Sequence, residues 1–162
     1  MQNDYKNKAS IALDHLTLGR VALFEHLLNH KSLEEARQFI EPVVEEFRQA
    51  AESPHLPRAL LTQGLYRFVA GARTGVESAQ NDFDEAWEIA ERGPMKLHLA
   101  DIHLFRARLF FREQSYPWNK NPDGTLRNYN DDLAAAEKLI NDSSYHRRDE
   151  ELADAKQVIL GK

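Results

Sequence analysis

The residues best suited to chemistry in this sequence are its seven histidines, because imidazole nitrogens bind transition metals. His26 and His30 are four residues apart, which places them on one face of a helix at a spacing that can hold zinc. The HExxH pattern is absent, and no carboxylate is placed as a third ligand. His98 and His103 are five residues apart and share no helical face. Since cysteine is also absent, we predict no metal site and no cofactor.

Catalysis by carboxylates or by a nucleophile has no better support in the sequence. The 26 Asp and Glu residues fall in the first turns of predicted helices and on solvated faces, where capping and the helix dipole explain them. There is no cysteine to act as a nucleophile, and no GxxxxGK[ST] phosphate-binding loop occurs. We therefore predict a protein that is not an enzyme and that has no catalytic residues.

Arginines could instead form a binding strip. Arg106, Arg108 and Arg112, followed later by Arg147 and Arg148, could bind an acidic peptide or a nucleic acid. The formal net charge of −5 argues against nucleic acid, because phosphate binding is driven by clustered cations. A solvated face on which glutamates pair with these arginines is the favoured interpretation.

Apolar residues recur at spacings of three and four in almost every long segment, and alternating strand patterns are nearly absent. This periodicity predicts an all-α fold in the 162 residues. No apolar run approaches the roughly 18 residues of a membrane span, and the start of the chain is polar, so we expect a cytoplasmic protein without membrane contact. The predicted helices cover approximately residues 9–28, 32–52, 57–72, 82–92, 95–113, 131–140 and 147–160.

Short motifs mark the ends of several of these helices. Ser32 with Glu35, and Asp82 with Glu85, have the spacing of capping boxes that begin a helix. The sequence Asn121-Pro122-Asp123-Gly124 predicts a turn. Before it, Tyr116-Pro117-Trp118 is either an aromatic lid that folds back on the helices or an exposed contact for a partner. The lid is favoured, since large aromatic side chains are usually packed.

An internal repeat is the main organising feature of the chain. Ala36, Ala86 and Ala136 are fifty residues apart, and each lies at the same place in a helix start of similar sequence. The preceding helices carry a small residue three positions after a leucine, at Gly19, Gly64 and Ala107. Antiparallel helices approach closely only where no large side chain intervenes, so we expect these small residues at the contacts of helical hairpins.

The sequence resembles the tetratricopeptide (TPR) family at this point. The matching residues are Leu18-Gly19 early in one helix, and Ala36 followed four residues later by Ile40 in the next. The pattern departs from the family in its longer connections and in Ala90, which replaces a large residue. The resemblance implies a right-handed solenoid of three helical hairpins in one domain, residues 9–162, after a flexible tail at residues 1–8. The hairpins would span about 9–53, 56–93 and 94–142, and a capping helix about 147–160.

Four further segments carry a closer resemblance over roughly residues 55–155. They are His55-Leu56-Pro57-Arg58, Asp84-Glu85-Ala86-Trp87-Glu88-Ile89-Ala90-Glu91-Arg92-Gly93-Pro94-Met95, Tyr116-Pro117-Trp118 and Tyr145-His146-Arg147-Arg148-Asp149-Glu150-Glu151-Leu152. These segments resemble the C-terminal TPR regions of bacterial signalling proteins of the STAND or NACHT type. The resemblance implies a sensor or protein-docking role, and because no phosphate loop is present, either a fragment or a stand-alone relative.

These observations predict a protein-interaction module that binds a peptide or a protein domain in a concave groove. A small-molecule sensor coupled to a separate effector domain is the alternative, and self-association through the solenoid ends, above all the first helix, is a further reading. The lysine and asparagine clamp by which some TPR proteins hold a C-terminal carboxylate is absent. Aligned with the family, the groove residues would be Leu16, Arg20, Leu23, Leu61, Leu65, Phe68, Leu104, Arg108 and Phe111, some of which belong to the core.

Overall fold

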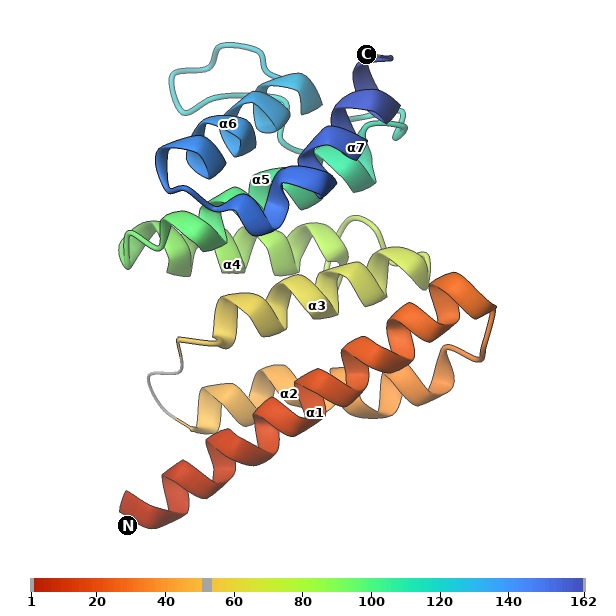
Figure 1. The fold of residues 1–162 in the computed structure, drawn as a ribbon, viewed down its shortest axis with the longest axis vertical. Coiled ribbons are helices and arrows are strands. Elements are labelled where there is room, and N and C mark those ends of the chain that lie inside the picture. Colours follow the sequence, from red (N-terminus) through yellow and green to blue (C-terminus); the bar gives the residue numbers. More distant parts are fainter. Residues whose placement is uncertain (1, 51–53, 162) are drawn as a thin grey trace. The chain divides into compact units, whose positions relative to one another are not determined.

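The computed structural model describes residues 2–50 and 54–161, and in these residues the protein is all-α. The only β-bridge in the described ranges joins Lys120 and Leu126. Figure 1 shows the helices, which pack mostly in sequential pairs. They are α1 (Gln2–Asn29), α2 (Glu34–Gln49), α3 (Leu56–Val69), α4 (Ala79–Arg92), α5 (Lys96–Phe110), α6 (Tyr129–Asp142), a short 3-10 helix (His146–Arg148) and α7 (Asp149–Leu160).

The chain divides into two compact units, Met1–Ala86 and Trp87–Lys162, and the division falls inside α4. The first unit holds α1 to α3 and most of α4, and the second holds the end of α4 with α5 to α7. The predicted arrangement of residues 9–162 as one solenoid of three repeats stays a prediction. Helix α1 begins at Gln2 rather than near Ala9, so helical backbone includes most of the segment expected as a tail.

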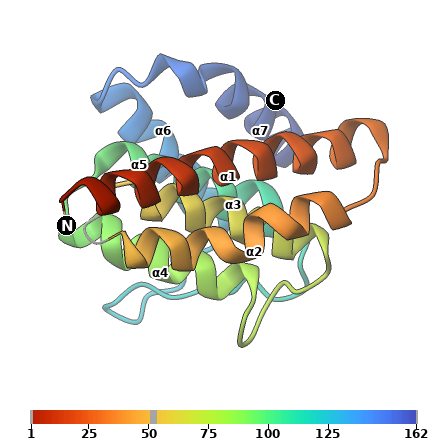
Figure 2. The ribbon, with the colours of Figure 1, turned by 90° about the horizontal axis from the view of Figure 1, so that it is seen from below.

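In the first unit, α1 and α2 form an antiparallel pair, and α3 packs against α2 (Figures 1 and 2). Helix α2 is amphipathic, because its apolar residues recur every three or four positions along one buried face while most of its charged residues lie at the surface. Between the three helices lies a small core of buried residues, and Leu33, Leu65 and Val69 pack at its edge. The buried members of this core are Ala22, Leu23, Ala36, Ile40 and Tyr66.

Two glycines mark the closest approaches between helices in this unit. A Cβ atom added to Gly19 would lie 2.6 Å from Cγ1 of Ile40 in α2. A Cβ atom added to Gly64 would lie 2.4 Å from the ring of Phe83 in α4. Both distances are well below van der Waals contact, so the helices can pack this closely only because these positions carry no side chain. The prediction that small residues lie at the hairpin contacts is confirmed.

Gly64→Ala is therefore expected to lower the free energy of unfolding by about 1–3 kcal/mol, the typical result of overpacking. Alanine is intrinsically favoured over glycine inside a helix by about 1 kcal/mol, so a net loss means that the clash with the buried Phe83 ring dominates. Urea unfolding followed by circular dichroism measures the change. The matched control is Gly93→Ala, whose added methyl would meet the flexible Met95 side chain 3.0 Å away. Equal or higher stability of Gly64→Ala would contradict the close packing.

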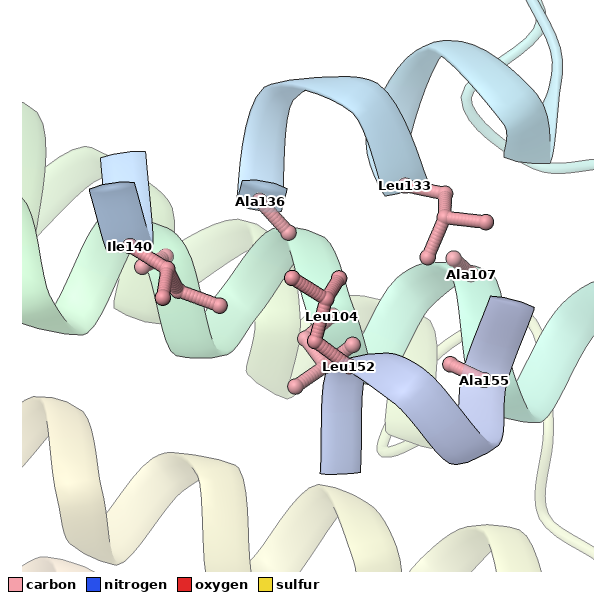
Figure 3. Packing of buried hydrophobic residues seen from close by; sticks show 8 residues of the cluster. Leu104, Ala107, Leu133, Ala136, Ile140, Leu152 and Ala155 are labelled. Atoms are coloured by element: carbon pink, nitrogen blue, oxygen red, sulfur yellow. The ribbon is translucent and has the colours of Figure 1, made fainter. Parts of the chain in front are cut away.

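In the second unit, α5 and α6 form the main antiparallel pair, and α7 packs on both (Figure 1). Alanines from three helices let the backbones approach, and leucine and isoleucine side chains fill the space between them. Figure 3 shows this cluster from close by, with Leu104 and Ala107 from α5 facing side chains of α6 and α7. The other residues labelled in the cluster are Leu133, Ala136, Ile140, Leu152 and Ala155.

The starts of α2 and α4 differ from the capping boxes predicted at Ser32 and Asp82. The Ser32 hydroxyl accepts the amide of Glu34 at 3.2 Å rather than that of Glu35. Helix α4 starts earlier than predicted, because the Ser78 hydroxyl accepts the Asn81 amide at 3.2 Å. Asp82 consequently lies inside the helix, where it is buried instead of acting as a cap. Helix α6 has a capping box formed by Asn128 and Asp131 that the sequence reading did not identify.

Candidate functional site

The structure divides the nine predicted groove residues into two groups. Four leucines, at positions 16, 23, 61 and 104, are buried in the cores of their units and are not accessible to a partner. Leu65 packs at the edge of the first core and is only partly exposed. The residues that retain exposed surface are Arg20, Leu65, Phe68, Arg108 and Phe111. Within the second unit, the structure brings Arg108 and Phe111 together at one pocket.

This pocket lies between α5 and α7 and has a volume of about 170 Å³. Arg108 belongs to the last turn of α5, and Phe111 follows the helix directly, so both project toward the neighbouring α7. Helix α7 contributes side chains from two successive turns, because positions three and four apart lie on one face. The α7 residues that line the pocket are Asp154, Ala155, Val158 and Ile159.

Charged groups of Arg108 and Asp154 lie beside the apolar side chains of this pocket. The Nη2 atom of Arg108 lies 3.3 Å from Oδ2 of Asp154, and its Nη1 atom lies 3.7 Å from Oε2 of Glu151. Both ion pairs are long and partly solvated, and exposed pairs of this kind contribute about 0–1 kcal/mol. The Arg108 side chain can therefore exchange these partners for a group on a bound molecule at little cost.

The size of the pocket limits what it can hold. Sites for small organic ligands usually have volumes of about 300–1,000 Å³, whereas this pocket has about 170 Å³. That volume suits one large apolar side chain better than a whole metabolite. The chemistry available is a hydrophobic contact with Phe111, Val158 and Ile159, next to one arginine and one aspartate.

A second cluster in this unit is polar and buried, with Asp132 of α6 at its centre. Oδ1 of Asp132 accepts hydrogen bonds from Nδ1 of His103 at 2.5 Å and from Nη2 of Arg127 at 2.6 Å. Its Oδ2 atom accepts a hydrogen bond from the Tyr116 hydroxyl. Burial alone would raise the pKa of Asp132, but the bonds and charges from His103, Tyr116 and Arg127 outweigh burial and lower the pKa. Burial of the Tyr116 hydroxyl, together with the neighbouring Asp132 carboxylate, raises the pKa of Tyr116.

The loop that contains Tyr116, Pro117 and Trp118, named the aromatic loop, folds back on this cluster. The guanidinium of Arg106 lies 4.9 Å from the ring centre of Trp87 and 4.4 Å from that of Trp118. The Trp118 ring also meets Phe110 edge-on, with ring centres 5.0 Å apart. Tyr116 is buried, so the loop is packed as the lid interpretation predicted. The turn after it forms as expected, since the Gly124 amide donates to the Asn121 carbonyl at 2.9 Å.

The basic strip considered from the sequence does not form. Arg106 is only 4% exposed, and its guanidinium lies between the two tryptophan rings. Arg148 binds both oxygens of Asp101, at 2.7 and 3.2 Å, and also pairs with Glu151. Arg108 and Arg148 pair with carboxylates of their own unit, as the favoured interpretation expected, whereas Arg106 is buried rather than part of a solvated face.

No group of three or more potential metal ligands comes together among the side chains of residues 8–50 and 54–161. His26 uses its Nδ1 atom in a 2.6 Å contact with the carbonyl oxygen of Lys31. None of the helices in these ranges is long and apolar enough to cross a membrane. No family model matches the chain, and neither a curated protein nor a solved structure is significantly similar to it.

Sequence reasoning found two of the six pocket residues and missed the four on α7. It assigned α7 only a capping role, although Val158 and Ile159 lie one turn beyond Ala155 on the same face. The signal in the sequence is the apolar spacing of Leu152, Ala155 and Val158 along α7. The structure leaves Val158 half exposed. An apolar face that extends beyond the core contact of a helix is the pattern that could have identified it.

Proposed function

We propose that the protein is a non-catalytic protein-interaction module that binds a peptide or a protein domain. For the chain as a whole we propose a divergent TPR architecture, a right-handed solenoid of three hairpins with α7 as the capping helix. The sequential helix pairs and the small residues at their contacts support this architecture. In keeping with the resemblance of residues 55–155, we propose a sensor or scaffold role in a bacterial signalling system.

The observation that carries the proposal is the pocket between α5 and α7. It combines two predicted groove residues, Arg108 and Phe111, with an exposed apolar side chain, Val158. A pocket of side-chain size that combines apolar side chains with charged groups at its rim is suited to anchoring one side chain of a protein partner. We therefore propose that one large apolar side chain of the partner enters this pocket and that Arg108 contacts a polar group beside it.

Val158→Asp is expected to weaken partner binding by at least tenfold, because it places a carboxylate in the pocket next to Asp154. Val158 is half exposed, so the substitution should leave the fold intact. The partner is first isolated by affinity capture on the immobilised protein, then reduced to its shortest binding segment, and the dissociation constant is measured by calorimetry.

The matched control is Leu126→Asp, which makes a similar change at an 82% exposed position of the loop. Equal retention of the partner by wild type and Leu126→Asp, with loss from Val158→Asp, supports docking at this pocket. Unchanged affinity in all three proteins would move binding away from the pocket. Turnover of a substrate that depends on Arg108 would contradict a non-catalytic role.

A further inference from the structure

The pocket between α5 and α7 has an arginine at its edge that no carboxylate of its own unit neutralises. Arg112 is exposed, and its guanidinium lies 4.9 Å from the centre of the Phe111 ring, which lines the pocket. It makes no ion pair with the side chains of residues 8–50 and 54–161. An arginine placed over an aromatic ring keeps the N–H groups at the edge of its plane available, and a carboxylate can accept two of them at once.

The neighbouring arginines already have carboxylate partners. Arg108 lies 3.3 Å from Asp154 and 3.7 Å from Glu151. Arg148 binds Asp101 at 2.7 Å and pairs with the same Glu151 at 2.6 Å. This connected group holds two arginines and three carboxylates, two of which belong to α7. The α7 side of the pocket is therefore acidic, whereas the opposite edge is basic.

This polarity determines which charges a partner can carry. A carboxylate beside α7 would meet Asp154 and be repelled, whereas a carboxylate beside Arg112 would be attracted. A nucleic acid would place negative charge on both sides at once, and its binding requires clustered cations rather than one arginine. A short peptide, in contrast, can place a single acid on one side of its apolar anchor.

Resting on the docking function proposed for this pocket, we propose that its occupant is a peptide segment with a large apolar anchor and an aspartate or glutamate within three residues of it. The anchor fills the pocket against Phe111, Val158 and Ile159, and the carboxylate pairs with Arg112. An extended chain advances about 3.3–3.6 Å per residue. An acid at that separation can therefore reach a guanidinium that lies 4.9 Å from a ring of the pocket wall.

Selection from a library of displayed random peptides on the immobilised protein tests the proposal. Wild type is expected to enrich peptides in which an acid lies within three residues of a large apolar residue. The enriched peptide of highest affinity is synthesised together with a copy that carries lysine in place of the acid, and fluorescence anisotropy measures both dissociation constants. The lysine copy is expected to bind wild type at least about threefold more weakly.

Arg112→Glu is expected to reverse this preference. It should bind the acidic peptide at least about threefold more weakly than wild type does, and should bind the lysine copy more tightly than the acidic peptide. The matched control is Arg92→Glu, the same change at an exposed position of the same unit. Arg92 precedes α5 whereas Arg112 follows it, so the control is expected to bind both peptides like wild type. Circular dichroism checks that each variant is folded.

The outcomes separate this inference from the docking function on which it rests. Equal affinity of wild type and Arg112→Glu for the selected peptide, with loss of binding in Val158→Asp, would overturn the acidic partner and leave the pocket as the docking site. Enrichment of basic peptides, or of no peptide, would also overturn the acidic partner. Peptides that bind Val158→Asp as tightly as wild type would contradict docking at the pocket itself.

Discussion

Asp132→Asn is expected to lower the free energy of unfolding by about 3–5 kcal/mol, the usual cost of removing one partner from a buried charged network. The carboxylate is fully buried, and it accepts hydrogen bonds from His103, Tyr116 and Arg127. Asparagine keeps the volume but loses the negative charge and presents an amide donor to groups that also donate. The Arg127 guanidinium would then lose the charge that compensates its partial burial.

The control for this prediction is Asp142→Asn, the same change in the same helix. Asp142 pairs with Lys138 at the surface, so its loss is expected to cost no more than about 0.5 kcal/mol. Urea unfolding at neutral pH compares the two variants. Intrinsic fluorescence adds a local readout, since both tryptophans of the chain contact Arg106 beside the Asp132 network. Similar stabilities of the two variants, with unchanged tryptophan emission, would show that the network does not hold the aromatic loop.

The helices could be predicted from the sequence because their signals are local. Apolar spacing, the small residues and the proline and glycine breaks all act within one or two turns, and Ala36 and Ala136 are buried as the repeat predicted. The polar cluster could not be predicted, because Asp132 meets His103 across 29 residues and Tyr116 across 16. Only the folded arrangement of α5, the loop and α6 brings these side chains together.

The spacing of Arg106 along α5 distinguishes this buried arginine from its exposed neighbours. It lies three residues after His103 and four before Phe110, so all three share one face of α5. The structure buries this face under the aromatic loop, whereas Arg108 on another face stays exposed. The binding strip and the favoured solvated face both placed the arginines on one exposed surface, although this rotation separates Arg106 from Arg108. An arginine on the same face as a buried phenylalanine is better assigned to the packed interior, where tryptophan rings can cover it.

Asp82 of α4 is a buried carboxylate whose ionisation is expected to lower stability. It is 2% exposed, and its Oδ1 atom accepts a 2.7 Å hydrogen bond from Nη1 of Arg67. Its Oδ2 atom is buried and has no hydrogen-bond partner. Burial raises the pKa of Asp82 to about 7, because the nearby Arg67 charge only partly compensates the loss of water and Glu85 opposes ionisation as well.

A carboxyl whose pKa is higher in the folded than in the unfolded chain stabilises the fold at low pH. The contribution is fully present below the unfolded pKa of about 4 and is lost as the pH rises through the folded value of about 7. Asp82→Asn cannot ionise and keeps its contribution throughout. We therefore expect the stability of Asp82→Asn relative to wild type to increase by about 2–4 kcal/mol between these two pH values.

Urea unfolding at a series of pH values measures this difference, and taking it between the two proteins cancels the titration of all other groups. Asp142→Asn again serves as control, because it removes the same formal charge from an exposed position. An increase that occurs only with Asp82→Asn would establish that burial, rather than the ion pair with Arg67, dominates at this position. A relative stability that falls with rising pH would show the reverse, because an ion pair that outweighs burial makes the ionised carboxylate the stabilising form.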